Sequence, residues 1–280
     1  MERACPKLEL LHYADDTTAF IQGKDFDELQ TIINDELQSV QKWLECNRLT
    51  LNIQKSSYMI FGSSEMGVNL SVNGINLEKV DRIKFLGVHF DNMLTFKYHY
   101  EHVLSKLSQV AGLTYRSKYI LPKSTLKSLY LSLGWSHISY GIVIWGKSSR
   151  VFETRINKVQ DRIVKNLYGR CNDETYRNNK LMRFSDAVKY FGGIKLYKEL
   201  NFPINPYFRD KISSLQSNFT YQTRFISNQN ITPPLFIRAR CHSSFLFQSI
   251  SFWNTLPVEL KESATINSFK RNLRNYMLSL

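Results

Sequence analysis

The chain has 280 residues, of which 43% are hydrophobic, and this content is enough for a substantial core and excludes a disordered tail. Its 37 Lys and Arg residues outnumber its 24 Asp and Glu residues, and this excess of positive charge favours nucleic acid as a binding partner over a basic protein. No stretch reaches the roughly 18 apolar residues of a membrane span, and acids occupy the start, where a signal peptide is apolar. The sequence therefore predicts an intracellular protein without a membrane partner, either nuclear or cytoplasmic.

The charge is unevenly distributed along the chain. Residues 1–70 hold six basic and eleven acidic residues, whereas 71–150 hold eleven basic and four acidic, and 151–280 hold twenty basic and nine acidic. An acidic region suits cations, and a basic surface suits a phosphate backbone. The pattern predicts metal chemistry near the start and nucleic-acid contact further along, with a merely solvated basic surface as the alternative.

The first motif is LLHYADDTTAF at residues 10–20, in which Asp15 and Asp16 lie between two apolar runs. The pattern predicts a strand, a two-residue turn made by the acids, and a second strand. Two adjacent carboxylates repel each other unless a cation shares the site, so a divalent metal is the predicted guest. An ordinary polar turn is the alternative interpretation.

The next segment is predicted to be one helix followed by short strands. Apolar residues recur at helical spacing over 26–44. Lys55 then precedes a strand-like stretch at 57–61, and Asn73-Gly74 is a strong signal for a type I′ hairpin. The segment IKFLGVHFD at 83–91 also indicates short strands.

From residue 96 the periodicity becomes helical. Helices are predicted over 98–120, over 123–146 with an interruption near Gly134, and over 152–169. The basic residues of the last helix could contact phosphate. The basic residues of 151–280 are nevertheless scattered along the sequence, so none of them is singled out as a phosphate contact. Beyond 170 the signal weakens, and only 264–280 regains helical spacing.

A pair of histidines occurs within the first of these predicted helices. His99 and His102 flank Glu101, but the sequence offers no evident third ligand. We therefore expect both histidines on a solvated helix surface and not in a metal site.

The order of four features resembles the reverse transcriptases (RNA-directed DNA polymerases) of non-LTR retrotransposons. These features are the acidic hairpin, the long helix, the lysine segment and the FLGV hairpin, and the resemblance covers residues 8–170. The segment 252–278 is similar to the tail of such polyproteins. The resemblance implies an α+β fold: a partial palm at 1–92 with an acidic β-hairpin, a helix and short antiparallel strands, a helical thumb-like region at 93–170, and a mixed region of uncertain fold at 171–280.

The resemblance also assigns roles to individual residues. It implies that Asp15, and less directly Asp16, bind Mg²⁺, and that Tyr13 packs beneath the primer end. Lys55 would neutralise or protonate the departing pyrophosphate, unless it caps a helix or stays solvated. A primer-positioning hairpin would be formed by Phe85, Leu86 and Gly87, the first two of which could also be plain strand core.

The implied partners are an RNA template, a DNA primer or RNA/DNA duplex, and deoxynucleoside triphosphates. Enzymes of this family need a further Asp on an earlier palm strand, and fingers, before the acidic hairpin, and twelve residues precede Tyr13 here. The resemblance thus leaves open whether the isolated chain is an enzyme, and we expect it to be inactive or nearly so. The alternative is a non-catalytic nucleic-acid-binding or interaction protein derived from a truncated element.

Overall fold

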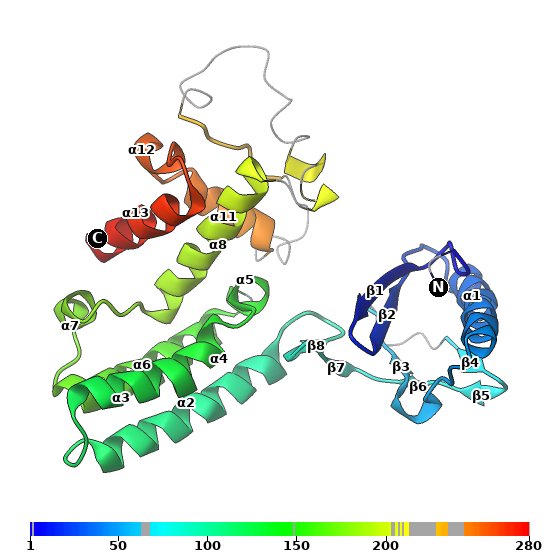
Figure 1. Cartoon of the computed structure of the whole chain (residues 1–280), viewed down its shortest axis with the longest axis horizontal. Helices are drawn as coiled ribbons and strands as arrows, with labels where there is room; N and C mark the ends of the chain where they lie inside the picture. The colour runs from blue at the N-terminus through cyan, green and yellow to red at the C-terminus, as the bar shows by residue number, and fades with distance from the viewer. Residues whose placement is uncertain are drawn as a thin grey trace. The chain divides into compact units, whose positions relative to one another are not determined.

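The computed structural model describes residues 1, 3–62, 68–147, 149–202, 205–206, 208, 210–212, 228–234 and 244–279. The chain divides into two compact units, Met1–Leu94 and Thr95–Leu280. The first unit contains one long helix and short strands, and the described part of the second is helical (Figure 1). This mixture is compatible with the predicted α+β class. The three predicted regions, divided at 92 and 170, stay predictions, although helices on both sides of residue 170 pack within one unit.

Short hairpins make up most of the first unit. Its elements are β1 (Glu9–Tyr13), β2 (Asp16–Phe20), α1 (Phe26–Cys46), the 3₁₀ turn η1 (Ile53–Lys55), β3 (Ser57–Tyr58), β4 (Ser71–Val72), β5 (Ile75–Asn76), β6 (Glu78–Lys79), β7 (Arg82–Phe85) and β8 (Val88–Asp91). The described strands pair as four two-stranded sheets, β1–β2, β3–β6, β4–β5 and β7–β8. They do not join into one sheet, so a polymerase palm remains a prediction.

The expectation of antiparallel strands holds for three of these pairs and is wrong for the fourth. Strands β3 and β6 run parallel, with Ser57 opposite Glu78. The connection between them contains the β4–β5 hairpin, and such a crossover returns the chain in its original direction. Periodicity does not reveal this direction, because it reports burial and not pairing.

The predicted helix over 26–44 is confirmed as α1. The side chain of Asp25 accepts hydrogen bonds from the amides of Asp27 and Glu28, which fixes the helix start. The side chain of Asn34 links the helix to the β4 region, since it donates to the Asn69 carbonyl at 3.0 Å and accepts from the Ser71 amide at 3.1 Å. Side-chain hydrogen bonds thus fasten α1 to the segment that begins β4.

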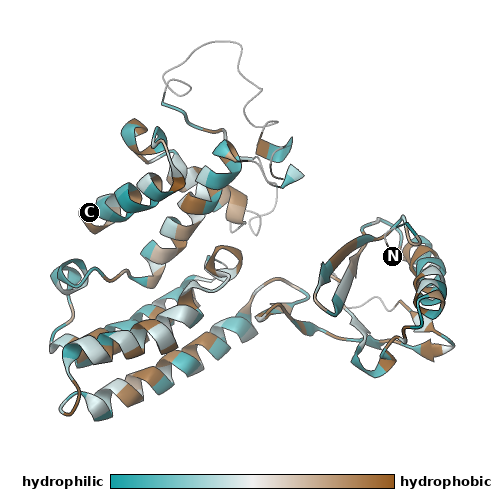
Figure 2. Cartoon of the chain, viewed as in Figure 1, coloured by the Kyte–Doolittle hydropathy of each residue, from teal (hydrophilic) through white to brown (hydrophobic). Residues whose placement is uncertain are grey.

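The described helices of the second unit surround two aromatic clusters. They are α2 (Lys97–Ser117), α3 (Lys123–Tyr130), the π-helical segment η2 (Leu131–Trp135), α4 (Ser136–Ser139), α5 (Ile142–Trp145), α6 (Arg150–Tyr168), α7 (Asp173–Asn178), α8 (Phe184–Asn201), α11 (Phe245–Trp253), α12 (Val258–Lys261) and α13 (Ile266–Ser279). Apolar and polar bands alternate along α2, α3 and α6, which pack together (Figure 2). No described helix is both long and apolar enough to cross a bilayer.

The first aromatic cluster lies where α2, α5, α6 and α8 meet. The Trp145 ring is 5.1 Å from that of Tyr100 and 5.4 Å from that of Phe184, measured between centroids. His99 packs 4.8 Å from Trp145 and is only 3% exposed. The prediction that His99 lies on a helix surface is therefore wrong, because the start of α2 is covered by α5.

The second aromatic cluster is formed by α8, α11 and α13. Tyr197 of α8 stacks on Phe269 of α13 at 4.2 Å, and Trp253 of α11 lies 5.9 Å from Phe269. The Trp253 indole donates a hydrogen bond to the Gln229 carbonyl at 2.9 Å. The sequence pattern indicated α13 but neither α8 nor α11, although these helices form the centre of this cluster.

The predicted interruption near Gly134 occurs as a change of helix type and not as a turn. Helical backbone continues through Gly134 as the π-helical segment η2, and the break occurs at Gly141, whose φ is +60°. A Cβ on Gly134 would lie 3.2 Å from the Tyr130 ring and 3.4 Å from Leu107. The glycine therefore serves close packing of two helices and not a turn.

Candidate functional site

The acidic motif forms the predicted hairpin, displaced by one residue. Tyr13 of β1 pairs with Asp16 of β2, so the two-residue loop is Ala14-Asp15 and not Asp15-Asp16. Ala14 has a φ of +54°, which lets the chain reverse one residue earlier than the sequence pattern predicts. Asp15 and Asp16 are both exposed at the tip, one in the loop and one in the strand.

The register of this hairpin places apolar residues and one acid on the same face. Leu11 and Tyr13 are two positions apart on β1 and therefore share one face of the hairpin. Their partners on β2, Thr18 and Asp16, lie on the same face. Tyr13 is 64% exposed. On the opposite face, the His12 ring and the Thr17 hydroxyl form a hydrogen bond of 3.0 Å. The hairpin thus presents an aromatic ring beside a carboxylate.

The acid pair has the chemistry, but not the number, of ligands for a complete two-metal centre. Carboxylate oxygens suit Mg²⁺, which is often held by one or two carboxylates together with water and substrate phosphates. Among the residues that the structure describes, no group of three His, Cys, Asp or Glu side chains could hold a metal ion. Asp15 and Asp16 could therefore supply part of a coordination shell, with further ligands from elsewhere.

Lys55 closes η1, directly before β3. The Asn52 side chain accepts a hydrogen bond from the Lys55 amide, and the Lys55 side chain is exposed. In the described part of the chain, no ion pair joins it to Asp15 or Asp16. The structure therefore does not bring this lysine into contact with the acids, and its catalytic role stays a prediction.

The FLGV segment forms a hairpin with a tight turn. Phe85 pairs with Val88, and the two loop residues Leu86 and Gly87 have φ values of +44° and +84°. The ring of Phe85 meets that of Phe90 edge to face at 6.2 Å. Phe85 is therefore half-buried in strand packing, whereas Leu86 is exposed at the tip. This geometry leaves Leu86 and Gly87 exposed at the hairpin tip, and their role with a primer stays a prediction.

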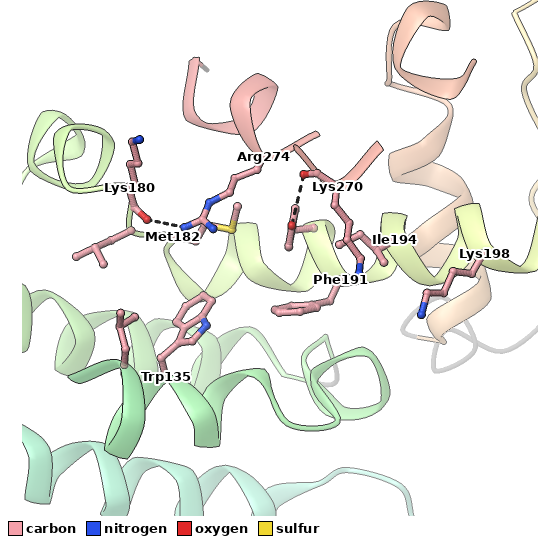
Figure 3. Close-up of a pocket in the computed structure, with 11 residues that line it drawn as sticks. Trp135, Lys180, Met182, Phe191, Ile194, Lys198, Lys270 and Arg274 are labelled. Atoms are coloured by element: carbon pink, nitrogen blue, oxygen red, sulfur yellow. Dashed lines mark hydrogen bonds between the residues drawn. The ribbon is translucent and has the colours of Figure 1, made fainter. Parts of the chain in front are cut away.

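A hollow of about 470 Å³ in the second unit is basic and apolar (Figure 3). Its lining comprises Leu131, Trp135, Lys180, Leu181, Met182, Tyr190, Phe191, Ile194, Lys198, Lys270 and Arg274. Arg274 donates a hydrogen bond to the Lys180 carbonyl at 2.9 Å, while the Lys180 side chain points away from Trp135. Because this lining contains no Asp or Glu, the hollow offers no carboxylate ligand for a metal ion.

A second hollow gathers basic residues that the sequence pattern left scattered. It lies between α2, the start of α3, and α6, and its lining includes Tyr115, Lys118 and Tyr119. In the segment YRSKY at 115–119, two tyrosines flank Arg116 and Lys118 at a helix end, and this signal could have indicated the site from the sequence.

Comparison with known proteins identifies two distant relatives. The chain is 23% identical over 164 residues to the RNA-directed DNA polymerase from mobile element jockey of Drosophila melanogaster, covering 56% of this chain and 18% of that protein. It is 22% identical over 202 residues to a probable RNA-directed DNA polymerase from transposon BS of the same organism, covering 70% of this chain and 20% of that protein.

The chain therefore spans about one fifth of the length of these two relatives. No family model matches the chain. No solved structure matches it either. The two similarities support the resemblance that the hairpins and the lysine segment indicated: the chain resembles part of the RNA-directed DNA polymerase of a retrotransposon.

Proposed function

We propose that the chain is part of the reverse transcriptase of a non-LTR retrotransposon, and that it contributes half of a palm and a thumb-like helical region. The observation that carries this proposal is the pair of tight hairpins, one acidic at Asp15 and one glycine-containing at Gly87, separated by a long helix and Lys55. The similarity to two mobile-element polymerases supports it independently. The ancestral reaction is RNA-templated DNA synthesis.

In this proposal the acidic hairpin binds Mg²⁺. Asp15 and Asp16 supply carboxylate oxygens from the exposed tip, and Tyr13 presents its ring to the primer end. Mg²⁺ held by Asp15 and Asp16 would supply Lewis-acid stabilisation of the charges on the primer 3′-hydroxyl and the leaving pyrophosphate during attack on a deoxynucleoside triphosphate. The hairpin holds the two acids in a fixed register, which is what positioning of such ions requires.

The other predicted residues serve the same substrates. The ammonium of Lys55 offers a positive charge or a proton to pyrophosphate, and the tip formed by Leu86 and Gly87 contacts the primer strand. The partners are an RNA template with a DNA primer, or their duplex. The basic second unit suits the phosphate backbone of this duplex.

We further propose that this chain alone has little or no polymerase activity. Strands β1 and β2 form a two-stranded sheet without a further described strand, and Leu11, Tyr13 and Phe20 leave an apolar face exposed. A two-stranded sheet is marginally stable in isolation. Both features support a role for the hairpin as part of a larger polymerase body that supplies the remaining metal ligand.

Metal binding can be tested without polymerase activity. Titration of the purified chain with Mn²⁺, followed by the electron paramagnetic resonance signal of free Mn²⁺, should reveal a site that Mg²⁺ competes for. An Asp15→Asn, Asp16→Asn variant should lose this site. The control variant Asp35→Asn, Glu45→Gln changes the same charge on exposed residues of α1 and should keep it. Equal Mn²⁺ binding by all three proteins would overturn the metal assignment.

Primer extension tests the inactivity of the chain. The purified chain should not extend a DNA primer on an RNA template in Mg²⁺ above the level of the Asp15→Asn, Asp16→Asn variant. Robust extension that this variant loses would contradict the proposed inactivity while supporting the acids as catalytic. Extension that the variant retains would contradict the assignment of the acids.

The non-catalytic alternative makes a different prediction. The hollow between α2, the start of α3 and α6 favours it, because its lining includes Lys118 and no acid, and it lies in the second unit whereas the hairpin lies in the first. A chain that binds RNA or DNA in a salt-sensitive way, without Mn²⁺ binding at the hairpin, would favour this alternative.

A further inference from the structure

A hollow of about 750 Å³ lies between the later parts of α2 and α6 and the start of α3. We call it the α2–α6 groove. It is lined by Ser108, Ala111, Gly112, Tyr115, Lys118, Tyr119, Lys123, Arg162, Lys165, Asn166, Leu167, Tyr168 and Gly169. The amide of Asn166 donates to the Ala111 carbonyl at 3.0 Å and to the Thr114 hydroxyl at 3.1 Å, so the two helices are fastened together at the groove.

The groove carries positive charge without compensation from its lining. Lys118, Lys123, Arg162 and Lys165 line it, and no acid does. None of the ion pairs found among the described residues involves these four cations. Four cations at the end of α2, at the start of α3 and on α6 create a positive potential that suits an extended polyanion.

Two exposed tyrosines stand beside these cations. Tyr115 is 60% exposed and Tyr119 is 88% exposed. The Lys118 ammonium lies 4.3 Å from the centroid of the Tyr115 ring and 4.9 Å from that of the Tyr119 ring. An aromatic side chain exposed to solvent contributes little to core packing. Exposed aromatic rings beside cations are typical of sites on which nucleic-acid bases stack.

We propose that the α2–α6 groove binds single-stranded nucleic acid. Unpaired bases stack on Tyr115 and Tyr119, while the strand's phosphates contact the four cations. A duplex is disfavoured because its bases are already stacked on one another and cannot cover the rings. The proposal is independent of polymerase activity, since every groove residue lies in the second unit and the acid pair lies in the first.

The basic hollow around Trp135 is a poorer candidate for this role. The Arg274 guanidinium already donates to the Lys180 carbonyl, and the Lys180 side chain points away from Trp135 (Figure 3). Lys198 and Lys270 nevertheless provide a matched control, because they line a cation-rich hollow on the same unit.

The stacking step is tested by fluorescence anisotropy of labelled oligouridylate and oligothymidylate of about 12 nucleotides, within the site sizes of known single-strand binders. With the full chain, Tyr115→Leu, Tyr119→Leu should weaken binding of one or both strands about tenfold or more. Tyr115→Phe, Tyr119→Phe keeps the rings and should bind as the wild type does. The RNA and DNA arms show which strand the groove prefers.

The charge step is tested through salt dependence. Arg162→Gln, Lys165→Gln should reduce the slope of log affinity against log salt concentration by about 1.4, or about 0.7 for each lost phosphate contact. Lys198→Gln, Lys270→Gln changes the net charge equally and should leave the slope unchanged. Thermal melting of each variant confirms that it folds.

Three outcomes would overturn the proposal. The first is wild-type affinity in the Leu variant, which would show that the rings do not stack bases. The second is an equal change of slope in the Lys198, Lys270 control, which would show that net charge alone drives binding. The third is tighter binding of a 12-base-pair duplex than of either single strand, at a length of about one helical turn. None of these outcomes bears on metal binding by the hairpin.

Discussion

The side-chain amide of Gln160 on α6 donates a hydrogen bond of 2.7 Å to the hydroxyl of Tyr130 on α3, where both residues are fully buried. The same amide donates to the Met182 carbonyl at 2.7 Å and accepts from the Phe184 backbone amide at 3.0 Å. Burial raises the pKa of the Tyr130 hydroxyl well above its usual range, which keeps the phenol neutral. One buried glutamine therefore ties α3, α6 and the start of α8 together.

This arrangement predicts a large effect of Gln160→Met, which keeps the side-chain length and removes the amide. Met182, Phe184 and Tyr130 would each keep a buried polar group without its partner, and the free energy of unfolding should fall by at least about 3 kcal/mol. The matched variant Tyr130→Phe removes one of the three bonds and should lower it by about 1 kcal/mol. Urea denaturation followed by circular dichroism measures both, and equal effects would contradict the network.

Two helical glycines predict opposite responses to alanine. A Cβ on Gly112 would meet only the Arg116 guanidinium, at 3.5 Å, so Gly112→Ala should stabilise the fold by about 0.5–1 kcal/mol through lower backbone entropy of the unfolded chain. A Cβ on Gly134 would press on Tyr130, which is held by Gln160, so Gly134→Ala should destabilise it by about 1 kcal/mol or more. Melting temperatures that shift in the same direction would contradict this reading.

Two of the tight turns in the first unit have a left-handed residue before a glycine, and that residue is Leu in one turn and Asn in the other. Leu86 has a φ of +44° before Gly87, and Asn73 has a φ of +54° before Gly74. Because Asn tolerates this conformation better than Leu, Leu86→Asn should raise the free energy of unfolding by about 1 kcal/mol, and Asn73→Leu should lower it by a similar amount. Denaturation of the first unit checks both signs. A destabilising Leu86→Asn would show that Leu86 packing outweighs the turn strain.

The Cys171 thiol is predicted to react slowly. Burial, and then the hydrogen bond to Asp161, raise its pKa to about 11, so little thiolate forms near neutral pH. At about pH 8, iodoacetamide should therefore modify the exposed Cys46 well before Cys171. Mass spectrometry of peptides over time measures both rates in one sample, and denatured protein, in which the rates should converge, is the control. Faster modification of Cys171 in the folded protein would contradict this prediction.

Asp186 near the start of α8 predicts a pH effect on stability. Burial raises the pKa of its carboxyl above the unfolded value of 3.8, against the opposing charges of Lys189 and Arg183. The folded state therefore binds this proton more tightly, and the group's contribution to stability is greatest below the unfolded pKa and falls as pH rises through the folded pKa. Asp186→Asn removes this decline.

Urea denaturation between about pH 3 and pH 6 should therefore show the stability of Asp186→Asn rising relative to the wild type. Glu259→Gln, on an exposed residue of α12, is the control and should show a smaller trend. A relative stability that falls with pH would mean that the ionised carboxyl of Asp186 is stabilised in the fold.

Local patterns were sufficient to predict several elements. The Asn73-Gly74 turn, the β7–β8 hairpin and the amphipathic helices α1, α2 and α6 all formed where the pattern placed them, because each depends on residues within a few positions of one another. The acidic hairpin also formed, with its loop displaced to Ala14-Asp15. The roles of Asp15, Asp16 and Lys55 stay predictions.

Other features depended on which elements meet, which periodicity does not encode. Helix α8 packs against α5, α6, α11 and α13, so apolar residues occur around much of its circumference and no amphipathic stripe marks it in the sequence. The sequence predicted His99 on a helix surface, whereas in the structure Trp145 of α5 covers it. The parallel pairing of β3 with β6 likewise follows from a crossover in space.

The sequence by itself determined the acid doublet, the two hairpin turns, the basic rear and the resemblance to a retrotransposon polymerase, because these depend on residue identity and short-range spacing. Only the tertiary structure decided that Tyr115 and Tyr119 share one groove with Arg162 and Lys165, and that Gln160 joins three segments of the fold. Side chains some forty residues apart become neighbours when apolar helix faces pack together, and that packing brings the polar groups into place.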